Sequence, residues 1–236
     1  MIPTISVCMA IKNGAPFLRD QISSILPQLA VDDELIISDD NSGDDSINII
    51  QAFKDTRIRV VQNSCGGIVS NFETSLRAAR GMYLFLADQD DVWKEDKIRT
   101  MLPYLQKYDL VVSDCSIVDE FLAPINESFF RRNHSGKGIL RNLFRNSYMG
   151  CCMAFHKRVL KKALPFPKEI RMHDAWIGLI GEFHFTVHFV NTNLVYHRRH
   201  TKNATSTSQS SKANWVDRIN GRYWLLKKLI QSRYAF

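Results

Sequence analysis

Three carboxylates within four residues are the part of this sequence that most directly suggests chemistry. Asp88, Asp90 and Asp91 follow the apolar segment 83–87, which has the pattern of a buried β-strand. Like charges this close repel one another, so the arrangement is costly unless a cation compensates it. Carboxylate oxygens suit Mg²⁺ or Mn²⁺, and either ion can in turn hold a diphosphate. The alternative is an acidic turn that caps the next helix.

Two further polar groups follow predicted strands. Asp39 and Asp40 come after segment 35–38, and Asn13 comes after segment 5–10. Because the carboxyl ends of parallel strands share one edge of a sheet, we expect these side chains near Asp88. One acidic group could then bind a base or ribose and the other a metal-bound diphosphate. The alternative is that Asp39 and Asp40 cap the following helix. The sequence has neither a dinucleotide-binding glycine motif nor a P-loop.

The first hundred residues alternate between strand and helix patterns. Strands are predicted at 5–10, 35–38, 58–61 and 83–87, and helices at 16–26, 45–53 and 71–79. This alternation predicts an α/β fold with a mostly parallel central sheet flanked by helices. The second half is less regular. It predicts a helix at 96–108, strands at 110–113, 149–155, 187–190 and 194–197, a helix at 174–183, and a mobile loop at 120–145.

Composition narrows the class of protein. The chain has 236 residues, 45% of them hydrophobic, which is enough for one substantial core. We find no apolar run long enough to span a membrane and no signal peptide pattern, so neither is expected. The five cysteines include the adjacent pair Cys151 and Cys152, show no Cys-x-x-Cys spacing, and argue against a disulfide framework or a structural zinc site. They suit a reducing cytoplasm.

The positive charge is concentrated at the C-terminus. Residues 198–236 hold nine Lys or Arg and one acidic residue, whereas the remainder has a net charge of −1. This pattern favours a local anionic partner such as a lipid surface over nucleic acid. We expect a polar linker at 201–212 and a basic amphipathic helix at 213–236. Its apolar stripe comprises Trp215, Ile219, Tyr223, Leu226 and Ile230. The alternative is a helix docked on the sheet or on another subunit.

Several segments together resemble the family 2 inverting glycosyltransferases, which have the GT-A fold. The matching segments are 12–14, 37–42, 71–73, 88–93, 150–155, 172–176 and 196–200, and they occur in the family's order. The resemblance covers about residues 4–203 and implies a GT-A domain at 1–200. Within the family, the chain looks most like bacterial O-antigen and capsule sugar transferases, many of which are rhamnosyltransferases.

The resemblance implies a role for each matching residue. The nucleotide-binding residues would be Ala10, Lys12, Asn13, Asp40, Asp88 and Gln89. Asp40 would bind the base, and segment 88–90 would be the Asp-x-Asp motif. Asp90 and His200 would hold Mg²⁺ or Mn²⁺, and Asp174 would be the catalytic base. The sugar and acceptor sites would be lined by Trp93, Gly150, Cys151 and His173.

These assignments match the chemistry of inverting transfer. A carboxylate must take the proton of the acceptor hydroxyl on the face opposite the leaving nucleotide diphosphate, and a metal neutralises the charge that develops there. Each residue also has a simpler interpretation. Asp174 could cap a helix, His173 could be structural, and His200 could belong to a solvated basic turn.

The expected function is therefore metal-dependent transfer of a hexose or deoxyhexose from a UDP- or dTDP-sugar. The resemblance and the basic tail imply a polyprenyl-diphosphate-linked glycan acceptor, on the cytoplasmic face of a bacterial plasma membrane. A homodimer is left open. One rival is a sugar-phosphate nucleotidyltransferase, although its glycine-rich basic loop is absent from residues 10–20. The other rival is a non-catalytic membrane- or glycan-binding module, which would not need Asp90 and Asp174 together.

Overall fold

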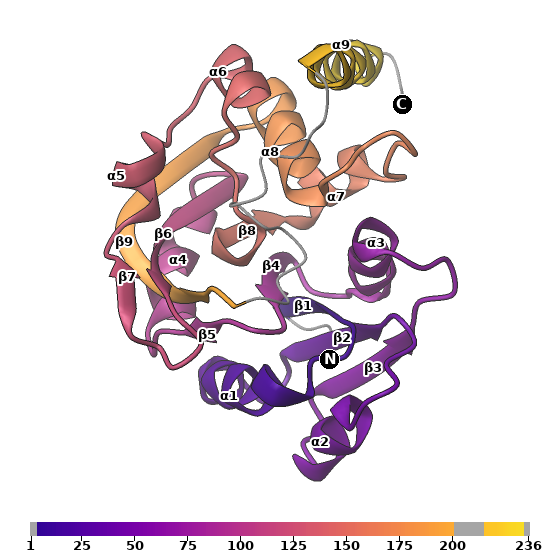
Figure 1. The fold of residues 1–236 in the computed structure, drawn as a ribbon, viewed down its shortest axis with the longest axis vertical. Helices are drawn as coiled ribbons and strands as arrows, with labels where there is room; N and C mark the ends of the chain where they lie inside the picture. Colours follow the sequence, from indigo (N-terminus) through magenta and orange to yellow (C-terminus); the bar gives the residue numbers. More distant parts are fainter. Residues whose placement is uncertain (1–3, 201–214, 234–236) are drawn as a thin grey trace.

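A nine-stranded sheet with helices on both of its faces forms the body of the protein (Figure 1). The computed structural model describes residues 4–200 and 215–233. The strand order is β3-β2-β1-β4-β8-β6-β9-β5, and β7 pairs with β6 outside this path. No helix in the described ranges is long and apolar enough to cross a bilayer.

The first half confirms the predicted α/β alternation. Strands β1 (Ile5–Ile11), β2 (Glu34–Asp39), β3 (Ile58–Gln62) and β4 (Tyr83–Asp88) are all parallel. Helices α1 (Ala15–Ile25), α2 (Ser46–Ala52) and α3 (Ile68–Ala78) connect them, with a short 3₁₀ turn, η1 (Leu26–Gln28), after α1. Figure 1 shows α3 on one face and α1 and α2 on the other. Because both faces are covered, β1 and β2 are buried along their whole length.

The second half of the sheet is mixed rather than parallel. Strand β8 (Met153–His156) runs antiparallel between β4 and β6 (Leu110–Val118), and β9 (Val187–Arg198) runs parallel to β6. The short strands β5 (Val92–Trp93) and β7 (Pro124–Asn126) pair antiparallel with β9 and β6. Helices α4 (Lys97–Leu105), α7 (Lys157–Ala163) and α8 (His173–His184) also belong to this half.

Three details of the second half differ from the sequence-based prediction. The segment predicted as a mobile loop, 120–145, contains β7 and two short helices, α5 (Phe129–Asn133) and α6 (Ile139–Phe144). Buried Asp114 holds this segment, because its carboxylate accepts hydrogen bonds from Ser128 Oγ at 2.5 Å and Phe130 N at 2.9 Å. The two strands predicted at 187–190 and 194–197 are one strand, β9. Residues Gly150–Cys152 form a 3₁₀ turn, η2, instead of the start of a strand.

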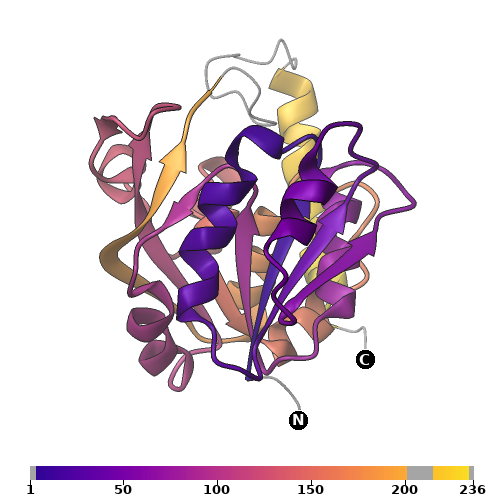
Figure 2. The same cartoon turned by 90° about the horizontal axis from the view of Figure 1, so that it is seen from below.

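The predicted C-terminal helix is present as α9 (Trp215–Gln231), on the opposite side of the sheet from α1 (Figure 2). It docks on the domain through fully buried Leu229 and through Ser232, whose Oγ lies 2.7 Å from Nε2 of His184. Two residues of the predicted apolar stripe, Tyr223 and Ile230, are exposed. The linker at 201–212 lies outside the described residues, and the role of α9 at a membrane stays a prediction.

Close packing of β4 against β1 gives a test of the fold. A Cβ added at Gly81 would lie 2.6 Å from the backbone nitrogen of Ser6, and the Gly81 nitrogen already donates a hydrogen bond to Ser6 Oγ at 2.8 Å. We expect Gly81→Ala to lower the free energy of unfolding by about 1–3 kcal/mol, because backbone must move. Gly43→Ala is the matched control, since no atom lies within 4 Å of its added Cβ. Equal urea midpoints for the two variants would contradict this packing.

Candidate active site

A cleft of about 840 Å³ lies at the carboxyl edge of the parallel strands and receives residues from both halves of the chain. It brings together most of the predicted site residues, namely Ala10, Lys12, Asn13, Asp40, Asp88, Gln89, Asp90, Gly150, His173, Asp174 and His200. The strand ends of β1, β2 and β4 supply one wall, and segment 129–150 with the start of α8 supplies the other. The expectation that these side chains share one site is consistent with the geometry.

Asp40 is held as an ionised acceptor at the end of β2. Its carboxylate accepts hydrogen bonds from Asn63 Nδ2 at 2.8 Å, Lys12 Nζ at 3.0 Å and the Gly67 nitrogen at 3.1 Å. Burial alone would raise the pKa of Asp40, but the bonds from Gly67, Lys12 and Asn63 outweigh it and lower the pKa. Asp40 is not the cap of the following helix, because the N-cap of α2 is Asp45, and it presents a fixed negative charge beside the cleft.

Gln89 ties the loop after β1 to the acidic turn after β4. Its Oε1 accepts a hydrogen bond from the Lys12 nitrogen at 2.8 Å, and its Nε2 donates to the Lys12 carbonyl at 3.2 Å. Asn13 adopts a left-handed backbone with φ 51°, a conformation that Asn tolerates better than most residues. Its Oδ1 accepts a hydrogen bond from the Gly43 nitrogen at 2.8 Å. These bonds fix the three strand-end loops relative to one another.

The carboxylates after β4 carry more negative charge than the protein neutralises. Burial, followed by the neighbouring Asp91 and Asp90, raises the pKa of Asp88 well above its usual range. Burial and Asp91 also raise the pKa of Asp90, although a bond from His200 Nε2 to its Oδ2 at 2.8 Å opposes the rise. Such raised values mean that a cation bound between these side chains would relieve their repulsion.

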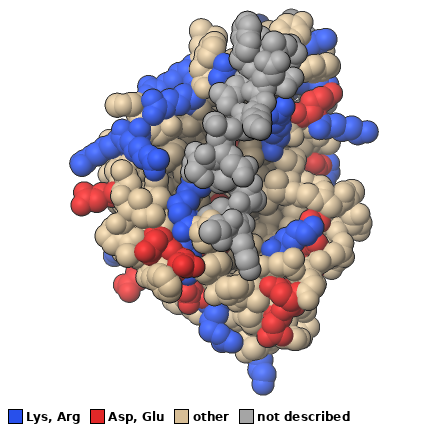
Figure 3. Space-filling view, in the orientation of Figure 1, with Lys and Arg blue, Asp and Glu red and all other residues tan. Residues whose placement is uncertain are grey.

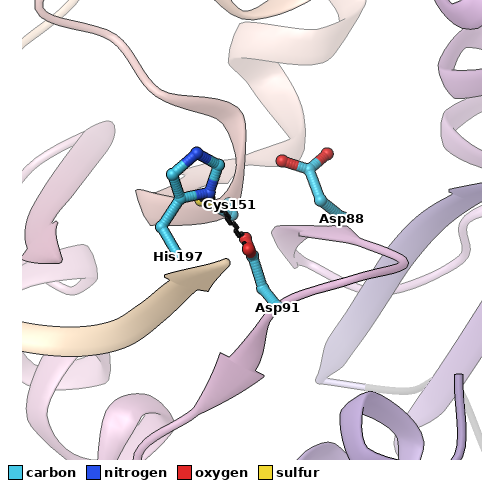
Figure 4. Close-up of side chains that lie close together, drawn as sticks. All are labelled: Asp88, Asp91, Cys151 and His197. Carbon is cyan, nitrogen blue, oxygen red and sulfur yellow. Dashed lines mark hydrogen bonds and ion pairs between the residues drawn. The ribbon is translucent and has the colours of Figure 1, made fainter. Parts of the chain in front are cut away.

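Asp91 forms a buried pair with His197 (Figure 4). His197 Nδ1 lies 3.0 Å from Asp91 Oδ1, and the Arg198 nitrogen donates to the same oxygen at 2.9 Å. Burial disfavours both charges, but their attraction raises the pKa of His197 and lowers that of Asp91. The pair therefore joins the turn after β4 to the end of β9.

Two groupings in this region could hold a metal ion. Ligand atoms of Asp88, Asp91, Cys151 and His197 all lie within 4.8 Å of one another. However, Asp91 and His197 already satisfy each other, and a thiol with a raised pKa is a poor ligand for Mg²⁺ or Mn²⁺. Asp88 and Asp90, with His200 beside them, offer hard oxygen donors at the cleft, where burial and the neighbouring carboxyls raise the pKa of both. The predicted Asp90 and His200, joined by Asp88, therefore fit such an ion better.

Two residues predicted to line the sugar and acceptor sites lie beneath the cleft. Trp93 is 2% exposed and packs near Phe85, while Cys151 is fully buried in η2, where only its neighbour Gly150 reaches the cleft. Between them lies buried Lys97, whose Nζ is 3.8 Å from the centre of the Trp93 ring and donates to the Cys151 carbonyl at 2.5 Å. The direct role expected for Trp93 and Cys151 is thereby corrected to support of the site from below.

Asp174 occupies the wall opposite the nucleotide side. It lies in the first turn of α8, whose N-cap is Met172, so it is not the helix cap that the simpler interpretation required. Its Oδ2 accepts a hydrogen bond from the Gly150 nitrogen at 3.2 Å, and its Oδ1 accepts one from Ala175 at 2.6 Å. Burial nevertheless raises the pKa of Asp174 to about 6. A carboxylate with this pKa is ionised at neutral pH and still has useful proton affinity.

The buried side chain of His173, next to Asp174, lacks hydrogen-bond partners among the described residues. Its ring stacks on Phe72 with centroids 3.8 Å apart, and neither ring nitrogen has a hydrogen-bond partner. Burial lowers the pKa of His173 to about 3, so the imidazole is neutral. His173 lines the cleft, and both of its ring nitrogens are buried there.

Part of the cleft wall was not predicted from the sequence. These residues include Phe17, Phe129, Asn133, Asn146, Tyr148 and Met149. Most of the residues from the second half of the chain lie in segment 120–145, which was predicted as a loop, or directly after it. Phe17 had a detectable signal, since it is an aromatic residue next to Pro16 after the first strand. In the structure its ring stacks on His200 with centroids 4.5 Å apart.

The buried charge of Asp174 predicts a gain in stability when it is removed. The folded state binds the Asp174 proton more tightly than the unfolded chain, so this carboxyl contributes stability below about pH 4 that is lost as the pH rises through 6. We therefore compare the effect of Asp174→Asn on the free energy of unfolding at two pH values. This effect should be about 1–3 kcal/mol more favourable to the folded state at pH 8 than at pH 4. Urea unfolding at the two pH values measures the difference.

Glu34→Gln is the control of opposite sign. Although burial opposes ionisation of Glu34, bonds from Ser6, Arg80 and Arg59 outweigh it and lower the pKa of this carboxyl. Its contribution to stability is present at pH 8 and lost on acidification, so Glu34→Gln should destabilise the protein most at pH 8. If Asp174→Asn instead followed the pattern of Glu34→Gln, the burial argument for Asp174 would be wrong.

The sequence of this chain is similar to those of known glycosyltransferases. The chain is 26% identical to Bacillus subtilis TuaG, named as a teichuronic acid biosynthesis glycosyltransferase, over 90% of this chain and 86% of that protein. It is also 26% identical to Escherichia coli WfgD, named as a UDP-Glc:alpha-D-GlcNAc-diphosphoundecaprenol beta-1,3-glucosyltransferase, over 74% of this chain and 68% of that one.

Solved structures with low sequence identity share the fold. Staphylococcus aureus TarS 1–349 in complex with UDP-GlcNAc superposes with a TM-score of 0.71 at 13% identity, over 99% of this chain and 73% of that chain. In the structure of the same fragment without that ligand, the match covers 60% of the TarS chain. A mannosyltransferase from Pyrobaculum calidifontis with GDP-Man and Mn²⁺ gives a TM-score of 0.62 at 15% identity, over 98% of this chain and 65% of that one.

The family model settles the assignment. The model described as glycosyl transferase family 2 matches residues 6–164, which is more than half of the chain. These residues include the strand ends that supply Asp40, Asp88 and Asp90, as well as the η2 turn that holds Asp174. The chain therefore belongs to glycosyl transferase family 2, and it is a glycosyltransferase with a GT-A-like fold.

Proposed function

We propose that this glycosyltransferase moves a hexose or deoxyhexose, with inversion, from a UDP- or dTDP-sugar to a lipid-linked glycan of the bacterial surface. The observation that carries the proposal is one cleft with Asp40 and the Asp88–Asp90 pair on one wall and Asp174 on the other. This arrangement supplies base recognition, diphosphate binding and proton removal at separate places. The family assignment argues against the nucleotidyltransferase and the non-catalytic module.

The donor nucleotide would lie along the ends of β1, β2 and β4. Ionised Asp40 is an acceptor for the N3–H group of uracil or thymine, with Ala10, Lys12 and Asn13 around it. Asp88 would accept hydrogen bonds from the ribose. The UDP-GlcNAc complex of TarS and the UDP-Glc named for WfgD support a uridine nucleotide.

Asp88, Asp90 and His200 would hold Mg²⁺ or Mn²⁺ in this cleft. Their donor set and the raised pKa of both carboxyls support this assignment. When bound, the ion would neutralise charge on the leaving diphosphate. The Mn²⁺ in the related mannosyltransferase structure is in keeping with this cofactor. His200 and Gln89 would keep the acidic turn in place around it.

Asp174 would take the proton from the acceptor hydroxyl. Its raised pKa suits a general base, and the Gly150 nitrogen orients its Oδ2. Neutral His173 and Gly150 would contact the sugar or the acceptor. The names of WfgD and WfaP, which both specify a GlcNAc-diphosphoundecaprenol acceptor, support a polyprenyl-diphosphate-linked glycan and a site next to the cytoplasmic face of the membrane.

A donor-hydrolysis screen tests the proposal. The protein is incubated with UDP- and dTDP-sugars, with Mn²⁺ or with EDTA, and release of the nucleotide diphosphate is measured. We expect metal-dependent release from one donor, and tight UDP or dTDP binding where the missing acceptor limits turnover. No release and no nucleotide binding across the panel would refute the assigned donor site.

Asp90→Asn tests the proposed metal site. Removing one negative ligand should weaken Mn²⁺-dependent nucleotide binding by about 100-fold, since a ligand is lost and charge attraction falls. Exposed Asp32→Asn, which lies before β2 and far from the acidic turn, serves as the control. Calorimetric titration of UDP in the presence of Mn²⁺ measures both. Unchanged affinity in Asp90→Asn would remove Asp90 from the metal site.

The raised pKa of Asp174 predicts the pH dependence of turnover. Because the ionised carboxylate is the base, kcat should rise with pH through about 6 and then level off. Asp174→Asn should lower kcat by about 100- to 10,000-fold and leave the Kd for UDP within about twofold. A pH series of single-turnover rates, with UDP titration in parallel, provides the measurement. Retained turnover in Asp174→Asn would exclude this residue as the base.

A further inference from the structure

Helix α6 has apolar side chains on two neighbouring faces, which are offset by one residue, or about 100° around the helix. Ile139 and Leu143 pack against the hydrophobic core, as expected for a surface helix. Leu140 and Phe144 lie one turn apart on the other face and are 69% and 68% exposed. Folding of the domain does not require this outer pair. Large apolar residues that share one exposed face commonly mark an interaction surface.

The surroundings of this pair are strongly basic. Residues 129–148 contain no acidic side chain, and all of their cations are exposed: Arg131, Arg132, Lys137, Arg141 and Arg145. Helix α9 adds Arg222, whose guanidinium lies 4.7 Å from the centre of the Phe144 ring and donates to the Phe144 carbonyl at 3.2 Å. Figure 3 shows Lys and Arg gathered at the upper left, over α5 and α6.

The segment that carries this pair also forms a wall of the cleft. Phe129 and Asn133 line the cleft just before α6, and Asn146 lines it just after. The residues that flank α6 in the chain therefore reach the substrate site. An acceptor whose lipid remains in a bilayer could reach the cleft when α6 rests on the headgroups.

We propose that Leu140 and Phe144, framed by Arg141, Arg145 and Arg222, dock this enzyme on an anionic phospholipid bilayer. The proposal rests on the proposed function, because a lipid-linked acceptor is what makes membrane contact useful. The two apolar side chains enter the boundary between headgroups and acyl chains, and the guanidinium groups pair with lipid phosphates. The main contact is thus α6, with α9 contributing Arg222.

Charge favours a bilayer over a second copy of the chain. A twofold interface centred on Leu140 and Phe144 would place the same cluster of arginines against itself. No acidic residue of segment 129–148 could relieve that repulsion. An anionic lipid surface instead offers both negative charge for the arginines and an apolar layer for the aromatic ring.

Vesicle sedimentation of the full-length protein tests the surface. The probes are vesicles of phosphatidylcholine alone and of phosphatidylcholine mixed with phosphatidylglycerol, without donor or acceptor. We expect binding to the mixed vesicles only. The double variant Leu140→Ser, Phe144→Ser should bind at least about tenfold more weakly, as expected when apolar contact is lost. Val31→Ser is the matched control, because Val31 is 85% exposed and lies at the other end of the strands.

A variant that removes positive charge tests the electrostatic part of the contact separately from the apolar part. Arg141→Gln with Arg222→Gln should weaken binding to the mixed vesicles and reduce its sensitivity to salt. Circular dichroism and thermal midpoints verify that each variant folds. Wild-type binding to both vesicle types alike, no wild-type binding, or wild-type affinity in the serine double variant would each overturn the proposal.

Two further measurements separate the alternatives. Sedimentation equilibrium of the protein alone reports its oligomeric state, and a dimer that dissociates in the serine double variant would assign the surface to a second copy and overturn the bilayer. Donor hydrolysis in solution does not involve α6. Loss of vesicle binding with intact donor hydrolysis therefore refutes the surface alone, whereas absent nucleotide binding with intact vesicle binding refutes the proposed function.

Discussion

The site depends on how the protein balances the charges of the carboxylates at the end of β4. Asp91 is compensated inside the protein by His197, and buried Lys97 adds a second positive charge below the turn. Asp88 and Asp90 are compensated much less, as their raised pKa values show. The excess charge is therefore directed into the cleft, where a cation can relieve it. Asp91 is fully buried and paired with His197, whereas Asp88 and Asp90 line the cleft.

The same turn is connected to the opposite wall of the cleft. Lys97 follows the acidic turn, packs on Trp93 and donates to the Cys151 carbonyl. The adjacent Gly150 nitrogen donates to Asp174, so one short chain of contacts joins the two walls. Burial lowers the pKa of Lys97 to about 8, which indicates that the ammonium is kept there at a cost. Trp93 and Cys151 matter for the site because they carry this connection.

The sequence was most informative where local patterns and burial agree. Strands such as β1 are apolar along their length, and polar residues at their ends could be placed on one edge because parallel strands end together. Antiparallel β8 was harder to place, since no local signal fixes the direction in which a short buried strand runs. Helices α5 and α6 are too short to be stable alone and depend on contacts such as Asp114 with Ser128. Their cleft residues were missed for that reason.

Under the proposed function, a contact with His173 would let the cleft tell substrates apart. A buried imidazole without partners has already lost its hydration, so a bound molecule that reaches it with a hydroxyl restores a hydrogen bond at little further cost. An otherwise identical molecule with hydrogen at that position leaves the ring unsatisfied. Stacking on Phe72 prevents the ring from turning toward water instead. One missing oxygen on a sugar can thereby be penalised more strongly than a change in its size.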